Sequence, residues 1–313
     1  MSLAVPFPYC RSREPWGSPG TVCRPTTALS LVEVTMAFEK HVFGRIEYLE
    51  RPAAQGAVLV LLHGIGSNAA TFEPLLARLP GSWRVIAWNA PGYSGSAPLD
   101  VEWPLASDYA KALRQLLDHL GLDRVFLAGH SLGCLIGAAF AAAHRERVGR
   151  LLLSSPALGH GVPRGCQLSA AAQARIDDLD AYGPDGFARR RAPRLVYAPQ
   201  ANTAIVDQVR DGMARVQSPG YGQAARMLAA GRLLDDAARL QVPTDVIVGA
   251  EDVVTPPEYA RRAHAAIKPA WRGSLTLVPA AGHALYQQAP AAFVAALEAP
   301  AETVDGHFER KRR

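Results

Sequence analysis

Apolar runs of strand length alternate with helical patterns along most of this chain, and this alternation limits the possible folds most strongly. Val58 to Leu62 is a continuous apolar run, as expected for a strand that is covered on both faces. Similar runs follow at 84–88, 125–128, 151–153, 246–248 and 275–278. Helical patterns separate several of them, and the clearest spans 105–120. Strands that alternate with helices predict an α/β fold with a mostly parallel sheet and helices on both faces.

About 90 residues between Leu153 and Val246 interrupt this alternation. They contain no apolar run of comparable strength, but helical patterns occur at 169–179, 205–216 and 221–234. We therefore predict a helical cap, 157–235, inserted into an α/β core formed by 36–156 and 236–300. Ligands of open α/β sheets bind outside the carboxyl ends of the strands, so this insertion is expected to cover the binding site.

The two ends of the chain differ from the part between them. Residues 1–35 are rich in Pro, Arg, Ser and Thr and have no apolar period, and we interpret them as a disordered or misassigned extension before a start at Met36. Residues 301–313 end in a basic run, which we interpret as a solvated tail.

Composition excludes several classes of function. With 313 residues, 49% of them hydrophobic and 19% charged, the chain has the balance of a globular enzyme. Its longest apolar run, 57–62, is far shorter than the roughly 20 residues that cross a membrane. Neither a stripe of basic and aromatic residues nor a zinc-finger spacing is present, so we expect no nucleic-acid partner. The four cysteines lack metal-ligand spacing, and we expect a cytoplasmic protein without disulfides, metal or cofactor.

The segment Gly129-His130-Ser131-Leu132-Gly133 lies between a predicted strand, 125–128, and a predicted helix, 132–144. A sharp turn from strand to helix exposes the serine hydroxyl, and glycines on either side let the two elements pack closely. The amino end of the helix also places backbone N–H groups beside the hydroxyl. The motif alone is weak, but in this context we predict a nucleophile at Ser131 and not a plain glycine-bounded turn.

The segment His63-Gly64-Ile65-Gly66 directly follows the apolar run at 58–62. In acyl transfer the carbonyl oxygen becomes an anion, and N–H donors must already point to the place where it forms. We predict that the backbone N–H groups of Ile65 and Leu132 form this oxyanion hole. His63 is interpreted as a residue that braces the loop.

His283 follows the run at 275–278 and precedes the last predicted helix, so a loop at the sheet edge can carry its imidazole to Ser131. It also completes the order nucleophile, acid, base along the chain. We predict His283 as the general base. Its rivals are His160, at the start of the cap, and His264, on a helix.

The acid that orients the base is expected after the run at 246–248. Asp252 follows this run and is predicted to fix the tautomer of the His283 imidazole and to stabilise its charged form. Glu251 leaves the same turn in the opposite direction and is the second candidate, and Asp245 within the strand is the third.

These motifs resemble those of the α/β-hydrolase superfamily over roughly 40–298. The segment 89–96, Asn-Ala-Pro-Gly-Tyr-Ser-Gly-Ser, is similar to the Asp-x-Pro-Gly-x-Gly-x-Ser turn of that family, with Asn89 in first place. Within the superfamily the chain looks most similar to capped members, namely 3-oxoadipate enol-lactonases, carbon–carbon hydrolases of aromatic pathways and small esterases. Carbon–carbon hydrolases usually carry Asn before the nucleophile, whereas this chain has His130. Haloalkane dehalogenases and epoxide hydrolases use an Asp nucleophile, which Ser131 excludes.

The resemblance implies a serine hydrolase that cleaves a small carboxylic ester or lactone through an acyl-enzyme, without a cofactor or metal. Two alternatives stay open. One is carbon–carbon hydrolysis of aromatic ring-cleavage products, and the other is a non-catalytic ligand receptor on the same fold. The expected partner is the small-molecule ester or lactone, with neither nucleic acid nor membrane, and the sequence predicts no oligomeric state.

Arg189, Arg190, Arg191 and Arg194 lie close together within the predicted cap. An arginine under a cap could bind a substrate carboxylate through two parallel hydrogen bonds. Four arginines in six positions cannot all face one pocket, and charge runs usually face solvent. We therefore favour a solvated helix end, and no substrate-binding residue is predicted.

Overall fold

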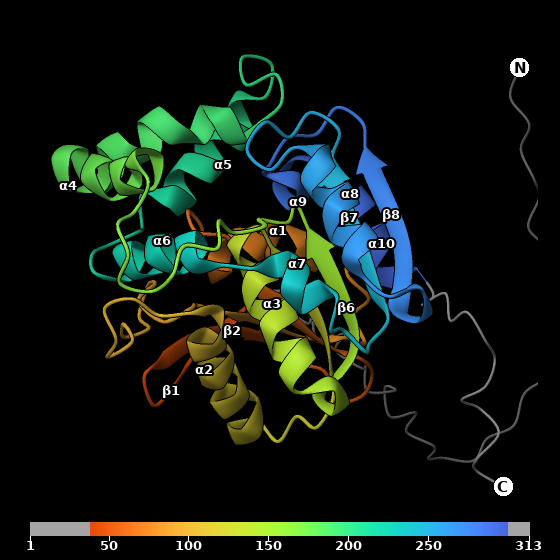
Figure 1. Cartoon of the computed structure of the whole chain (residues 1–313). Coiled ribbons are helices and arrows are strands. Elements are labelled where there is room, and N and C mark those ends of the chain that lie inside the picture. Colours follow the sequence, from red (N-terminus) through yellow and green to blue (C-terminus); the bar gives the residue numbers. More distant parts are fainter. Residues whose placement is uncertain (1–37, 300–313) are drawn as a thin grey trace, which may run out of the picture. The chain divides into compact units, whose positions relative to one another are not determined.

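The computed structural model describes residues 38–299, so the expectations for 1–35 and 301–313 lie outside the described residues. Eight strands form one sheet in the order β1-β2-β4-β3-β5-β6-β7-β8 (Figure 1). β1 pairs with β2 and β2 with β4 in antiparallel fashion, and the other neighbours are parallel. This confirms the predicted, mostly parallel sheet. The strands are β1 (Glu39–Phe43), β2 (Ile46–Arg51), β3 (Val58–Leu62), β4 (Arg84–Trp88), β5 (Val125–His130), β6 (Val148–Ser154), β7 (Thr244–Gly249) and β8 (Arg272–Val278).

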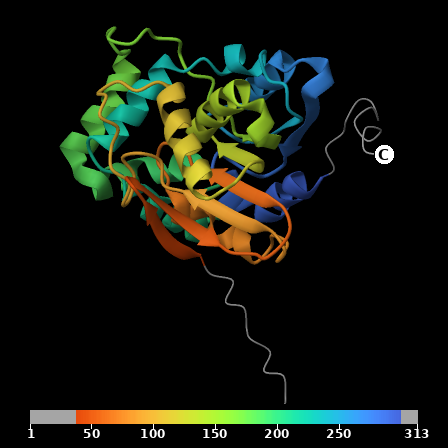
Figure 2. The ribbon, with the colours of Figure 1, turned by 90° about the horizontal axis from the view of Figure 1, so that it is seen from below.

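Helices connect the parallel strands and cover both faces of the sheet (Figure 2). The α-helices of the described chain are α1 (Glu73–Leu76), α2 (Ala106–His119), α3 (Leu132–Ala143), α4 (Ala170–Arg191), α5 (Thr203–Met213), α6 (Gly220–Ala230), α7 (Leu233–Ala237), α8 (Pro257–Ala266), α9 (Leu285–Gln288) and α10 (Pro290–Glu298). Short 3₁₀ turns lie before α1 at η1 (Ala69–Phe72) and after α4 at η3 (Ala192–Leu195). Among these helices none is both long and apolar enough to cross a membrane.

The central strands are apolar at consecutive positions because helices pack on both of their faces. Successive side chains of a strand point to opposite faces of the sheet. In β3, Val60 and Leu62 belong to the cluster that contains buried residues of α2, α3 and α8. Leu59 and Leu61 belong to the cluster that contains buried residues of α1, α9 and α10. This burial explains why the run at 58–62 has no polar alternation.

The cap consists of α4, η3, α5 and α6, which follow one another between β6 and β7 and pack together. Figure 1 shows α4 and α5 together above the core, with α5 nearer to α9. α5 contacts η1 and α9, so the cap rests on two short helical elements of the core. α7 packs against α3 and α8, which places it in the core, and the predicted cap boundary at residue 235 therefore falls inside α7.

α4 is bent sharply in its middle. Gly183 has φ 62° and ψ 173°, which is not helical, and Pro184 follows it. Arg191 Nη2 donates a hydrogen bond to Asp178 Oδ2 at 2.6 Å, although the two residues are 13 positions apart. In a straight helix this separation spans about 20 Å. The second half of α4 therefore folds back against the first half. The sequence pattern predicts a helix only over 169–179, so it contains neither the bend nor the second half of α4.

Candidate active site

Ser131 occupies a sharp turn between β5 and α3. Its φ of 53° and ψ of −110° are unfavourable for a residue with a side chain, and the surrounding packing must hold this strain. A Cβ on Gly129 would lie 2.5 Å from the Gly133 carbonyl oxygen, and one on Gly133 would lie 2.2 Å from the Leu62 carbonyl oxygen. Both glycines are therefore required for the close approach of strand and helix. The turn presents a serine side chain at the carboxyl end of a central strand.

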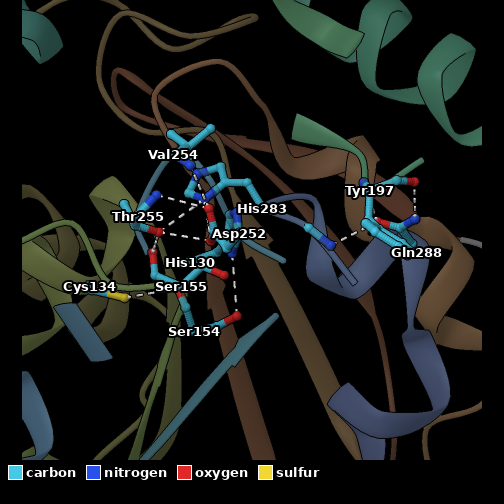
Figure 3. A network of polar contacts seen from close by, with 11 residues as sticks. His130, Cys134, Ser154, Ser155, Tyr197, Asp252, Val254, Thr255, His283 and Gln288 are labelled. Carbon is cyan, nitrogen blue, oxygen red and sulfur yellow. Dashed lines mark hydrogen bonds and ion pairs between the residues drawn. The ribbon is translucent and has the colours of Figure 1, made fainter. Parts of the chain in front are cut away.

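His283 and Asp252 form a buried pair beside this turn (Figure 3). His283 Nδ1 lies 2.9 Å from Asp252 Oδ2, and the side chains are 6% and 0% exposed. Because the carboxylate only accepts, Nδ1 carries the proton of the neutral ring, and Nε2 can accept one. Burial acts to raise the pKa of Asp252, but the positive charge of His283 and hydrogen bonds to the carboxylate lower it to about 2. Asp252 is therefore ionised at neutral pH.

Thr255 completes the set of donors around the Asp252 carboxylate. The backbone N–H groups of Val254 and Thr255 each donate to Oδ1 at 2.8 Å. The Thr255 hydroxyl lies 2.9 Å from Asp252 Oδ2, 3.1 Å from His283 Nδ1 and 3.0 Å from the Ser155 carbonyl oxygen. Three donors from one turn thus hold the carboxylate in position against the imidazole (Figure 3).

Ser131 and His283 line the same cavity, which has a volume of about 220 Å³ and lies between the core and the cap. Their side chains make no hydrogen bond to each other in the structure. Hydrogen bonds between catalytic groups are often long without a substrate and become shorter in the complex. Because both residues line this cavity, their side chains lie on the same side of the molecule and are open to the same small compound.

The loop after β3 packs directly against the Ser131 turn. A Cβ on Gly64 would lie 3.2 Å from the Ser131 Cβ. The N–H groups of Ile65 and Leu132 donate to no acceptor within residues 38–299. The N–H of Leu132 is unpaired because it begins α3, and the first N–H groups of a helix have no partner inside the helix. Both predicted oxyanion donors are thus available beside the serine.

His63 and Tyr93 fix this loop. His63 Nδ1 donates to the Gly64 carbonyl oxygen at 2.8 Å, and its Nε2 accepts from the Ala90 N–H at 3.0 Å. This pattern needs a neutral ring, and burial lowers the pKa of His63 to about 4. The Tyr93 hydroxyl donates to the Ile65 carbonyl oxygen at 2.7 Å. These contacts confirm that His63 braces the loop.

The other sequence candidates for base and acid lie in different environments. His264 contacts the Gly273 carbonyl oxygen at 2.8 Å, outside the cavity, and Glu251 is exposed. Asp245 pairs with Arg150 at 2.8 Å within the sheet. His160 lines the cavity but is exposed, and the buried carboxylate contacts His283 instead. The structure therefore brings together Ser131, Asp252 and His283.

His130, directly before the serine, is buried beneath the site. Its ring centroid lies 5.0 Å from that of His283, and its Nδ1 lies 3.4 Å from the Ser154 hydroxyl. Burial, together with the positive charge that His283 can carry, lowers the pKa of His130 well below its ordinary value. A neutral His130 therefore packs under the site.

The loop that carries His283 is tied to the cap. The Ala284 N–H donates to the Leu195 carbonyl oxygen at 2.8 Å. Gln288 accepts from the N–H groups of Gly282 and Tyr197 and donates to the Tyr197 carbonyl oxygen, at 2.9 to 3.0 Å (Figure 3). The position of the imidazole therefore depends on where the chain leaves η3.

The cap arginines do not all face solvent, and this corrects the expectation of a solvated helix end. Arg189 and Arg190 are exposed and do not line the cavity, whereas the half-buried Arg191 lines it together with Arg175. Arg194 also lines the cavity, although it is exposed. The reason is the bend in α4, because the returning half of the helix turns one side of its end toward the cavity.

Thr255 and Arg175 also line the cavity, and no motif of the sequence predicts them. Thr255 could have been found, because an Asp side chain commonly accepts from the backbone two residues on, which brings the residues just after Asp252 around its carboxylate. No local sequence pattern marks Arg175, since its place on the cavity wall depends on the bend of α4. Within residues 38–299 no cluster of three or more His, Cys, Asp or Glu side chains could hold a metal ion.

Comparison with known sequences gives the family and two similar enzymes. Residues 59–296 match the family described as the alpha/beta hydrolase family. The chain is 30% identical over 253 residues to a putative carbamate hydrolase RutD of Variovorax paradoxus, covering 76% of this chain and 89% of that protein. It is 29% identical over 257 residues to a pimeloyl-[acyl-carrier protein] methyl ester esterase of Neisseria meningitidis, covering 79% of this chain and 78% of the esterase.

A solved structure shares the fold. The enol-lactonase of Burkholderia xenovorans superposes with a TM-score of 0.70 at 22% identity, covering 83% of this chain and 96% of the lactonase. At this level of identity the similarity concerns the arrangement of strands and helices only.

Proposed function

The chain belongs to the alpha/beta hydrolase family and is a hydrolase, and from this premise we propose that it cleaves a small carboxylic ester or lactone through an acyl-enzyme on Ser131. The observation that carries this proposal is the His283–Asp252 pair, held at 2.9 Å, whose imidazole lines the same cavity as the strained serine. Such an arrangement serves acyl transfer because a hydroxyl becomes a nucleophile only when a base can remove its proton.

In the proposed first half-reaction, Ser131 Oγ attacks the acyl carbon while His283 Nε2 takes the hydroxyl proton. The N–H groups of Ile65 and Leu132 donate to the oxyanion of the tetrahedral intermediate. His283 then gives its proton to the leaving oxygen, and the alcohol departs. The serine is left as an ester of the acyl group.

In the proposed second half-reaction, His283 removes a proton from water, which attacks the acyl-enzyme. The Ser131 oxygen leaves with the proton from His283, and the carboxylic acid is released. One ester and one water thus yield one acid and one alcohol, or one hydroxy acid from a lactone. Asp252 stays ionised throughout, because its lowered pKa of about 2 keeps it negative beside the imidazolium.

The test is a comparison of variants on p-nitrophenyl acetate. We expect Ser131→Ala and His283→Ala to lower kcat by about 10³-fold or more, because nucleophile and base act as one unit. His264→Ala is the matched control, since His264 lies outside the cavity, and it should retain the wild-type rate. Full turnover by Ser131→Ala would contradict the proposed roles.

Residue 130 gives no support to carbon–carbon hydrolysis. Carbon–carbon hydrolases resemble this chain but usually carry Asn at this position, whereas a buried, neutral His130 stands here. Turnover of a vinylogous diketone compared with that of a lactone separates the two reactions.

A further inference from the structure

The charged side chains that line the cavity are mainly arginines. Its lining includes Arg175, Arg191 and Arg194, but neither Asp nor Glu from the described residues. Asp252 lies behind His283 and does not line the cavity. Apart from the imidazoles, every ionised side chain on the wall is therefore positive. A cavity lined by charge of one sign concentrates ligands of the opposite sign.

Arg175 and Arg191 line one cavity because α4 folds back at Gly183. They lie on opposite sides of the bend, yet both line the cavity next to Tyr221. Burial raises the pKa of Tyr221, and the positive charges of Arg175 and Arg191 counteract this rise. Within residues 38–299 Arg175 has no carboxylate partner.

Arg191 is held in place by neighbouring side chains, but not all of its N–H groups have a hydrogen-bond partner. Its Nη2 donates to Asp178 at 2.6 Å, and the guanidinium lies 4.9 Å from the centre of the Phe187 ring. Its Nε is buried and has no hydrogen-bond partner. No acceptor for its Nη1 lies within residues 38–299, and a carboxylate in the cavity would supply one.

We propose that Arg175 and Arg191 form a carboxylate site, so that the substrate is an ester or lactone that carries a second, free carboxylate. This rests on the proposed function. The wall also contains the apolar side chains Phe187, Val209, Met213 and Leu228, which suit a short methylene chain between the two ends of such a substrate. Asp178 is a positioning residue that fixes the Arg191 guanidinium.

The kinetic test compares monomethyl glutarate with methyl pentanoate, which has the same chain length but no free carboxylate. For the wild type we expect kcat/KM to be about 10- to 100-fold higher for the charged ester, as charge-assisted hydrogen bonds imply. Arg175→Gln and Arg191→Gln should each lower this ratio by about 10-fold or more, mainly through KM. Arg190→Gln is the matched control, since Arg190 lies on the same helix, is exposed and stacks on Tyr182.

A wild-type ratio near one, or a ratio unchanged in both variants, would overturn the carboxylate site. Calorimetric titration with glutarate provides a readout that does not need turnover. The wild type and Arg190→Gln should bind glutarate, and Arg175→Gln and Arg191→Gln should bind it at least about 10-fold more weakly. Equal binding by all four proteins contradicts the site. Hydrolysis of neither ester, with glutarate still bound through the two arginines, would contradict the proposed function alone.

Discussion

At the scale of single residues, Thr255 has the most informative position. Its hydroxyl lies within hydrogen-bond distance of both Asp252 and His283, and its N–H donates to the same carboxylate. A valine has the same shape but lacks the hydroxyl. Thr255→Val should therefore loosen the orientation of the carboxylate and the imidazole.

We expect Thr255→Val to lower kcat/KM on p-nitrophenyl acetate by about 5- to 50-fold, the loss of one buried hydrogen bond. Thr255→Ser should restore most of the rate, because it restores the hydroxyl. The acid limb of the pH–rate profile should also move in Thr255→Val, since a purely structural role would leave it in place. Wild-type kinetics in Thr255→Val would show that the hydroxyl is dispensable.

Among residues of the site, the sequence predicts those that follow a strand in a fixed chain order. Ser131, Asp252 and His283 each come directly after an apolar run, and parallel strands bring their carboxyl ends to one edge. The turn motif at 89–96 does not explain why its first residue is Asn89 and not Asp. Its amide donates to Glu47 Oε1 at 2.8 Å and accepts from the Ala69 N–H, so the Asn is explained only by a buried glutamate 42 positions away.

At the scale of elements, the bend of α4 positions two of the cavity arginines. Gly183 has a φ of 62°, and a Cβ added to it would meet no atom within 4 Å, so a side chain there encounters backbone strain but no clash. The Arg191–Asp178 hydrogen bond is possible only while the bend persists. Substitution of Gly183 therefore tests the bend itself.

Gly183→Ala should lower the free energy of unfolding by about 1–2 kcal/mol, the cost of a positive φ for a residue with a side chain. Gly81→Ala is the matched control, because Gly81 also has open space but no positive φ, and it should be close to neutral. Urea unfolding measures both. If Gly183→Ala is as stable as Gly81→Ala, the bend is not held at this residue.

The elements of the core and the three main helices of the cap could be predicted, but the bend of α4 could not. Strands such as β3 are recognisable because both of their faces are buried, so every position is apolar. The course of α4 depends on one glycine and on contacts between residues 13 positions apart, which local periodicity does not contain. For this reason the position of the cap can be predicted from the sequence, whereas the expectation that its arginines face solvent is wrong for Arg191.

At the scale of the whole molecule, buried neutral histidines make stability depend on pH. Burial lowers the pKa of His63 to about 4 and that of His130 well below its ordinary value. The unfolded chain binds these protons near pH 6.5, and the folded chain does not. The stabilisation is therefore complete above about pH 6.5 and is lost as the pH falls toward about 4.

We expect His63 to account for about 3 kcal/mol of the unfolding free energy lost between pH 7 and pH 4, with His130 adding to this loss. His63→Gln cannot be protonated, so its unfolding free energy should fall less over the same range. Urea titrations at several pH values provide the comparison. Parallel curves for wild type and variant would show that His63 does not titrate as proposed.

The central claim is that Ser131 becomes acylated. Rapid mixing with p-nitrophenyl acetate, an acid quench and mass spectrometry of the intact protein and its peptides test it directly. We expect one acetyl group on the peptide that contains Ser131 in the wild type and none on that peptide in Ser131→Ala. Turnover that leaves the Ser131 peptide unmodified, with the acetyl group on another residue, would contradict it.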